Sequence, residues 1–125
     1  WALGEASVKA VLLVGSHARN EARKDSDVDL VIMAENPDFY THDATFVNRF
    51  GTCMRSTRED YGKLVSIRAF YDHDLEVEFG ITSPDWASLP LDAGTRGVLS
   101  DGYKILVDKN NSLQEVAEHI PQQPD

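Results

Sequence analysis

The sequence predicts a mixed α/β (α+β) domain, built on a small mixed β-sheet flanked by helices. Its 125 residues suit one ordinary domain. A hydrophobic content of 42% with 26% charged residues is enough for a core and excludes a disordered chain. Short apolar runs of strand type alternate with segments of helical pattern. We expect one domain over residues 1–120 and a disordered polar tail over residues 121–125.

The first half of the chain predicts two strands joined by a short helix. "VKAVLLVG" (8–15) is a short, apolar run ending at glycine, which indicates a buried strand. "SHARNEAR" (16–23) begins with a serine suited to a helix N-cap and continues with good helix formers. "DVDLVIM" (27–33) predicts a second strand, whose continuous apolar content favours burial on both faces. The segment 36–51 is expected to open with a turn and continue as a helix, with Gly51 as its C-cap.

The second half predicts a hairpin and a closing helix. Residues 63–81 alternate in two runs around a tight turn at 72–74. In the second run, Leu75, Val77 and Phe79 are expected to face the core. The other expected elements are a strand at 53–60, short helical pieces within 83–102, a strand at 103–108 and an amphipathic helix at 111–120.

Composition restricts the partners. The net charge is −9, from 12 basic and 21 acidic residues. Nucleic-acid-binding domains usually carry a basic face, so a polynucleotide partner is not expected. The acidic balance fits a cationic substrate or a divalent metal. No apolar run approaches the roughly 20 residues of a membrane span, and no membrane partner is expected. The single cysteine, Cys53, excludes an internal disulfide and favours a cytoplasmic location.

Two carboxylates stand at the start of the second strand. Side chains alternate along a strand, so Asp27 and Asp29 share one face, roughly 6–7 Å apart. They repel each other in a low-dielectric setting, and no lysine or arginine alternates with them in the strand. A divalent cation is the economical partner, because Mg²⁺ binds one or two protein carboxylates together with substrate phosphate oxygens.

A Gly-Ser pair precedes these acids. Gly15 ends the first expected strand and Ser16 opens the expected helix, so free backbone N–H groups and a positive dipole end meet there. Glycine allows close approach of a phosphate, and the serine hydroxyl can donate to it. Arg19 and Arg23, or Lys24, are near enough in sequence to add positive charge. The segment therefore combines a phosphate site with metal-binding acids.

The residues around Gly15 and Asp27 do not match three familiar phosphate-binding or calcium-binding motifs. No Gly-Lys-Ser/Thr follows Gly15, which excludes a P-loop, and G-x-G-x-x-G is absent. "DSDVDL" begins like a calcium loop, but Leu30 occupies the position of the required glycine. Asn36 stands where the bidentate glutamate of such a loop belongs.

Gly15-Ser16, a ten-residue spacer and Asp27-Val28-Asp29-Leu30 together resemble the signature of the DNA polymerase β-like nucleotidyltransferase superfamily. The chain is most similar to the bacterial minimal and antibiotic-type members. The resemblance implies that residues 1–120 are a nucleotidyltransferase domain with the polymerase β-like fold. It implies transfer of a nucleoside monophosphate from a nucleoside triphosphate, expected to be ATP, to a hydroxyl of a small molecule or protein. Asn20 departs from the glycine common in relatives, which affects loop geometry.

The resemblance also implies a third carboxylate on a neighbouring strand. Glu76 and Glu78 share one face of the expected strand, as Asp27 and Asp29 do. Glu78 is the first candidate because it lies deeper in the strand, and Glu76 is the second. The catalytic set is thus Asp27, Asp29, Glu78 and Glu76. Two Mg²⁺ ions are expected on Asp27, Asp29 and Glu78.

The nucleotide-binding residues implied are Gly15, Ser16, Arg19, Arg23 and Arg96. Arg96 lies in a glycine-containing segment that either contacts phosphate or simply begins a helix. Trp86 is either a stacking platform for a base or a core residue. Small relatives often take the acceptor pocket from a second domain or a partner subunit, so a homodimer or a partner protein is compatible with the chain.

Two other functions stay open at this point. One is a non-catalytic nucleotide- and metal-binding module that acts as the partner in a toxin–antitoxin-like pair. The other is a calcium-binding structural domain, which would bind calcium without nucleotide.

Overall fold

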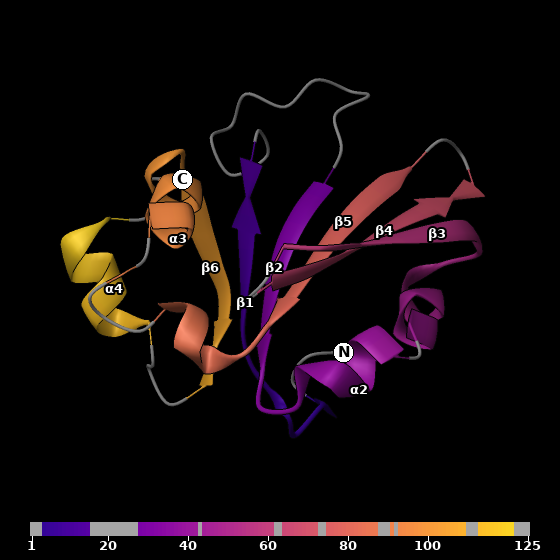
Figure 1. The fold of residues 1–125 in the computed structure, drawn as a ribbon, viewed down its shortest axis with the longest axis horizontal. Coiled ribbons are helices and arrows are strands. Elements are labelled where there is room, and N and C mark those ends of the chain that lie inside the picture. Colours follow the sequence, from indigo (N-terminus) through magenta and orange to yellow (C-terminus); the bar gives the residue numbers. More distant parts are fainter. Residues whose placement is uncertain are drawn as a thin grey trace.

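The fold was obtained as a computed structural model (Figure 1). The residues it describes are 4–15, 28–42, 44–61, 64–72, 75–87, 91, 93–109 and 113–121. The expected helix at 16–23 and the expected tail at 121–125 fall outside them, apart from residue 121.

The centre of the molecule is one six-stranded sheet with the strand order β3-β4-β5-β2-β1-β6. The central pair, β2 and β5, is parallel, and every other neighbouring pair is antiparallel. The strands are β1 (Val8–Val14), β2 (Val28–Ala34), β3 (Cys53–Asp60), β4 (Leu64–Tyr71), β5 (Glu76–Thr82) and β6 (Tyr103–Asp108). This arrangement confirms the mixed sheet and the expected strands.

Short helical segments flank the sheet: α2 (Pro37–His42), η2 (Ala44–Phe50), η4 (Pro84–Ala87), α3 (Ala93–Ser100) and α4 (Gln114–His119). The single helix expected over 36–51 was wrong, because an α-helix and a 3₁₀ helix occupy that stretch. Residues 44–50 contain aromatic, β-branched and asparagine residues, which are weak helix formers. The tighter 3₁₀ segment buries Phe46 and Val47 against the sheet.

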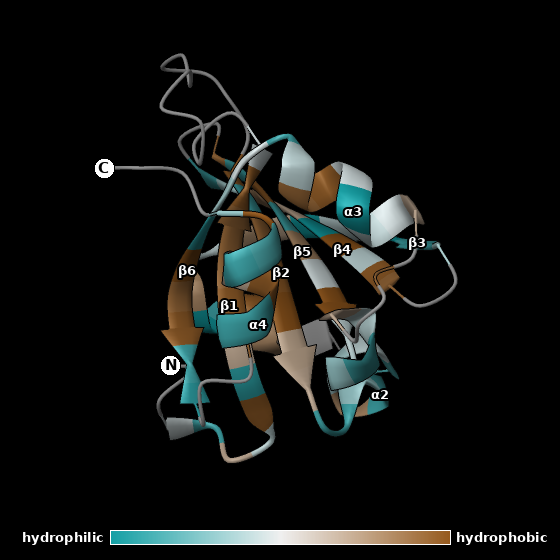
Figure 2. Cartoon of the chain, turned by 90° about the vertical axis from the view of Figure 1, so that its left-hand side faces the viewer, coloured by the Kyte–Doolittle hydropathy of each residue, from teal (hydrophilic) through white to brown (hydrophobic). Residues whose placement is uncertain are grey.

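Strand alternation gives the sheet two apolar faces with separate cores. One face packs Ile32, Phe79 and Ile81 against Tyr40 of α2 and Phe46 of η2. The other packs an apolar set against η4, α3 and α4; its members from the sheet are Ala10, Leu12, Val14, Val31, Met33 and Tyr103. Figure 2 shows α3 and α4 in front of the second face.

Leu75 lies outside the core. It is 44% exposed, because β5 begins one residue later, so its expected place in the core was wrong. No helix within the described ranges is long and apolar enough to cross a membrane.

Candidate active site

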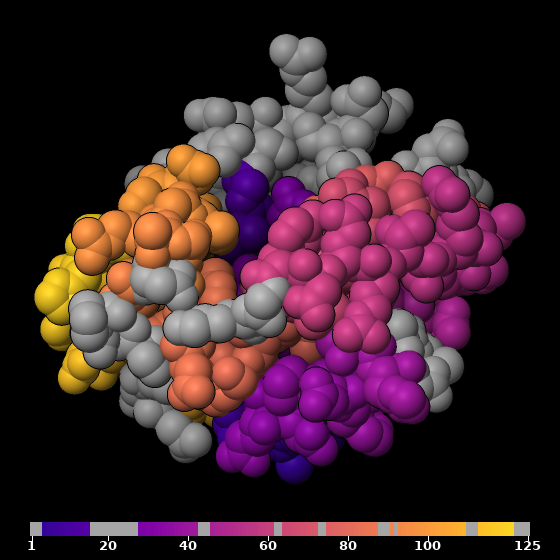
Figure 3. All heavy atoms as spheres, viewed as in Figure 1, coloured from indigo at the N-terminus to yellow at the C-terminus, as the bar shows by residue number. Residues whose placement is uncertain are grey.

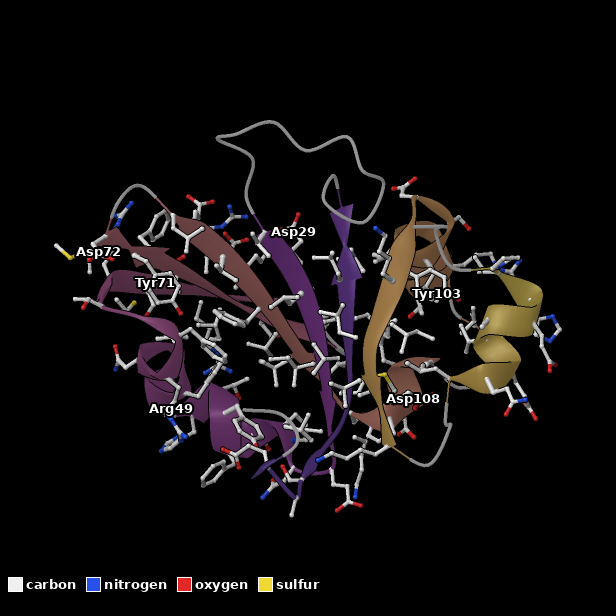
Figure 4. All side chains as sticks on the ribbon, turned by 180° about the vertical axis from the view of Figure 1, so that it is seen from behind. Asp29, Arg49, Tyr71, Asp72, Tyr103 and Asp108 are labelled. Atoms are coloured by element: carbon white, nitrogen blue, oxygen red, sulfur yellow. The ribbon has the colours of Figure 1, made fainter. Side chains whose placement is uncertain are left out.

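A row of polar side chains crosses the second face of the sheet. Asp29 of β2 pairs in register with Glu78 of the parallel strand β5, and Glu78 pairs with Arg68 of β4. Residues paired in register point to the same face, so the two carboxylates are neighbours. Figure 4 shows Asp29 near the start of β2. The row therefore brings one predicted acid of β2 beside one predicted acid of β5.

Gly15, the residue that follows β1, lies against Asp29 of this row. Its φ is +74°, a left-handed conformation that favours glycine. A Cβ at this position would overlap with Oδ2 of Asp29, so the missing side chain leaves the space that the carboxylate occupies. Close approach at Gly15 was expected for phosphate. The structure adds a second reason for glycine, which is room for Asp29.

Glu78 is held on both of its carboxylate oxygens. Ser66 Oγ donates to Oε1 at 2.9 Å, and Arg68 Nη2 donates to Oε2 at 2.7 Å. Arg68 also donates through Nη1 to Glu76 Oε2. The guanidinium thus bridges the two candidate glutamates, which are both only partly exposed. Glu78 is the one in register with Asp29, whereas Glu76 lies two residues earlier, at the start of β5.

Ser66 and Arg68 are functional candidates that the sequence interpretation missed. Their signal was a serine and an arginine on the same face of an otherwise apolar strand, in "LVSIRAFY". Register between β4 and β5 could not be read from that signal alone, because the hairpin loop does not fix it uniquely.

An open pocket of about 480 Å³ lies beside Glu78. Its lining comprises Tyr61, Leu64, Glu78, Trp86, Gly94, Thr95 and Val98. Figure 3 shows the surface hollowed between α3 and the β3–β4 region. A carboxylate and a phenol therefore stand among mainly apolar and aromatic walls, as in a pocket for a small organic molecule.

Two aromatic residues of this pocket have distinct settings. Trp86 is buried within the core below α3, where its carbonyl accepts a 3.0 Å hydrogen bond from Thr95 Oγ1. Of the two placements considered for Trp86, the one in the core is confirmed, and Trp86 also lines the pocket. Tyr61 is 62% exposed and donates to Glu59 Oε2 at 2.5 Å. That hydrogen bond is the main cause of a raised Tyr61 pKa.

The other predicted site residues stand as follows. Asp27, Ser16, Arg19 and Arg23 lie outside the described residues. Arg96 is exposed on α3 and is not among the residues that line the pocket in the described part of the chain. Its proposed contact with phosphate stays a prediction.

Within the described ranges, no three histidine, cysteine, aspartate or glutamate side chains form a metal-binding group. The donor chemistry of the described acids nevertheless suits Mg²⁺. Asp29 and Glu78 present hard carboxylate oxygens on adjacent strands, and Gly15 leaves room for the Asp29 carboxylate. Asp27 is the third acid that the sequence predicts for this site.

A sequence profile described as streptomycin adenylyltransferase matches residues 1–123. The chain belongs to this family. The match confirms the resemblance to polymerase β-like nucleotidyltransferases and identifies the chain as a member of a nucleotidyltransferase enzyme family.

The fold agrees with a solved structure described as the crystal structure of an aminoglycoside 6-adenyltransferase from Bacillus subtilis. The TM-score is 0.54 at 12% sequence identity, over 69% of this chain. At this identity the likeness supports the shared fold of the family. The matched part of this chain spans 32% of that chain, so about two thirds of the solved chain lie outside the match. No match was found among curated protein sequences.

Proposed function

We propose that the chain transfers the AMP group of ATP to a hydroxyl of an amino-sugar acceptor of the aminoglycoside type, with Mg²⁺ as the metal. The single observation that carries the proposal is the register of Asp29 with Glu78, beside Gly15 on one side and an open pocket on the other. Family membership supplies the reaction class.

The two substrates would approach this row from opposite sides. Gly15 and the following segment, which contains Ser16, are the proposed triphosphate side. The pocket that includes Glu78, Tyr61 and Trp86 is the proposed acceptor side. An amino sugar suits this pocket because its amines are cationic, its ring presents apolar C–H edges to aromatic walls, and the chain has a net charge of −9.

The chemistry is an in-line displacement at the α-phosphorus. The acceptor oxygen forms a bond to this phosphorus, the bond from phosphorus to the β-phosphate oxygen breaks, and pyrophosphate leaves. Glu78 is the proposed acceptor of the hydroxyl proton as the oxygen attacks, a role supported by its position among the residues that line the pocket. The remaining side chains contribute position and charge, which dominate phosphoryl transfer.

Mg²⁺ would be held by Asp29 and Glu78, together with Asp27 as the sequence predicts. When bound, the ion neutralises negative charge on the phosphates. A two-ion site, as in other phosphoryl-transfer enzymes, is part of this proposal.

The test is pyrophosphate release from ATP with MgCl₂, measured with and without a panel of aminoglycosides that includes streptomycin. We expect release only when an acceptor is present, and its loss on adding EDTA. Mass spectrometry should find the acceptor heavier by one AMP group, and neutral sugars serve as the matched acceptor control.

Two outcomes would overturn the proposal. Binding of ATP without pyrophosphate release for every acceptor would favour the non-catalytic module. Calcium binding without any nucleotide binding would favour a structural calcium domain. Isothermal titration with ATP and each cation separates these cases.

A further inference from the structure

Arg68 is a charged residue in the middle of an apolar strand, and its contacts suggest why it is there. It lies on β4 between Thr57 of β3 and Glu78 of β5, in the same row as Asp29. Its guanidinium reaches both glutamates of β5, with one nitrogen on each. A planar fork of this kind fixes two carboxylates relative to each other, which a lysine cannot do.

Ser66 completes the arrangement from the same strand. Its hydroxyl is buried and donates to the Glu78 oxygen that Arg68 does not bind. Glu78 therefore receives a donor on each oxygen, and its carboxylate plane is set by β4. Glu76 accepts the other half of the arginine fork.

We infer that Ser66 and Arg68 are positioning residues that hold the Glu78 carboxylate beside Asp29, and that Glu76 acts by anchoring Arg68. This inference rests on the proposed function for the role of Glu78. It also assigns different roles to the two glutamates that the sequence left as alternatives. Glu78 faces the reacting groups, whereas Glu76 acts on them only through the arginine.

The direction in which the affinity for a divalent cation changes, when Arg68 is replaced, distinguishes a positioning role from a purely electrostatic one. Removing a nearby positive charge should strengthen binding of a divalent cation if Arg68 only competes for the carboxylates. Loss of an oriented ligand should weaken it, as removal of groups that orient metal ligands does. Mn²⁺ monitored by electron paramagnetic resonance is a suitable probe and requires no turnover.

The experiment uses Arg68→Gln, Arg68→Lys and Ser66→Ala in the full chain. We expect weaker Mn²⁺ binding in Arg68→Gln and a kcat that is lower by roughly 10–100-fold, with little change in the KM for ATP. Arg68→Lys should restore part of the kcat. Ser66→Ala changes no charge and should also weaken Mn²⁺ binding. Tighter Mn²⁺ binding in Arg68→Gln would overturn the inference. Unchanged Mn²⁺ binding in both Arg68→Gln and Ser66→Ala would also overturn it.

The role of Glu76 is tested by a double-mutant cycle. Glu76→Gln should lower kcat in the wild-type background but have little further effect in Arg68→Gln, because both changes remove one arrangement. If the effects of Glu76→Gln and Arg68→Gln on kcat are additive, Glu76 acts independently of Arg68. Arg55→Gln is the matched control, since Arg55 lies over the Phe70 ring at 4.2 Å on the neighbouring strand. It should leave Mn²⁺ binding and kcat unchanged.

Failure of this inference is distinguishable from failure of the proposed function. If the wild-type chain releases no pyrophosphate with any acceptor, the proposed function fails, while the Mn²⁺ titrations still report on Glu78. Circular dichroism and thermal unfolding of each variant identify any that does not fold. In that case Ser66→Ala, the smallest change, decides the result.

Discussion

The two faces of the sheet use the same strands for different purposes. Phe79 on one face is almost fully buried against Phe46, with ring centroids 5.1 Å apart. Glu78, its neighbour in sequence, points to the opposite face and is tied to Ser66 and Arg68. The first face packs an apolar cluster against α2 and η2, whereas the second is apolar under α3 and α4 and carries charged residues at the start of β2 and β5. The buried core and the proposed site are thus separated by one residue along β5.

The largest expected effect on activity comes from Glu78→Gln. The amide keeps the size of the side chain but cannot accept a proton, so kcat should fall by about 10²–10⁴-fold. The free energy of unfolding should change little, because the side chain is partly exposed. Pyrophosphate release and urea unfolding measure the two quantities. Glu115→Gln, on the exposed side of α4, is the matched control with unchanged activity. A large fall in the free energy of unfolding of Glu78→Gln, together with the loss of kcat, would contradict the separation of the core from the proposed site.

Phe79→Ala should have the opposite profile. Truncation of this buried ring leaves a cavity and should lower the free energy of unfolding by about 3–5 kcal/mol. Any folded fraction should retain most of its kcat. Urea titration gives the stability, and Phe39→Ala, at a ring that is 67% exposed, should lose less than about 1 kcal/mol. Similar losses at both positions would show that this face is less tightly packed than its burial indicates.

Gly15→Ala should affect both the stability of the fold and the proposed metal site, because Gly15 has a left-handed backbone conformation and leaves room for Asp29. Alanine at a φ of +74° costs about 1–2 kcal/mol, and its Cβ would displace the Asp29 carboxylate. We therefore expect a moderate loss of stability together with a clear loss of Mn²⁺ binding. Gly97→Ala is the control, because nothing lies within 4 Å of its added Cβ in α3. Wild-type Mn²⁺ affinity in Gly15→Ala would count against a role for Asp29.

The smallest expected effect is that of Tyr71→Phe on the apolar face. The phenol donates to the Val47 carbonyl at 2.6 Å, and its loss should cost about 1 kcal/mol. Burial raises the pKa of Tyr71 from 10.0 to about 12. The folded state therefore holds the proton more tightly, so this contribution is complete below pH 10 and is lost as the pH rises to about 12.

Denaturant unfolding at about pH 8 and about pH 11 should reveal this dependence. The stability difference between wild type and Tyr71→Phe should narrow at the higher pH. If this stability difference is the same at both pH values, folding does not raise the pKa of Tyr71. Figure 4 shows Tyr71 on the side of the sheet where η2 lies, away from Tyr103 on the side of α4.

Local patterns were sufficient to predict the strands of the sheet and to nominate Asp29 and Glu78 as candidate site residues. The apolar run ending at Gly15, the alternation around Asp29 and the alternation around Glu78 each depend on neighbours in sequence, and strand periodicity records them directly. The break of the segment 36–51 into α2 and η2 was not foreseen, because packing of Phe46 and Val47 on the sheet overrides the helical pattern.

Residue types and their local spacing were enough to predict the fold class, the strand alternation and the candidate acidic residues. Three features became known from the packed sheet alone: which glutamate stands beside Asp29, that Arg68 and Ser66 bind that glutamate, and that Tyr61, Trp86 and Thr95 border one pocket. Those facts depend on the register between strands and on the packing of distant segments, and a shift of one residue would have pointed the same side chains to the other face.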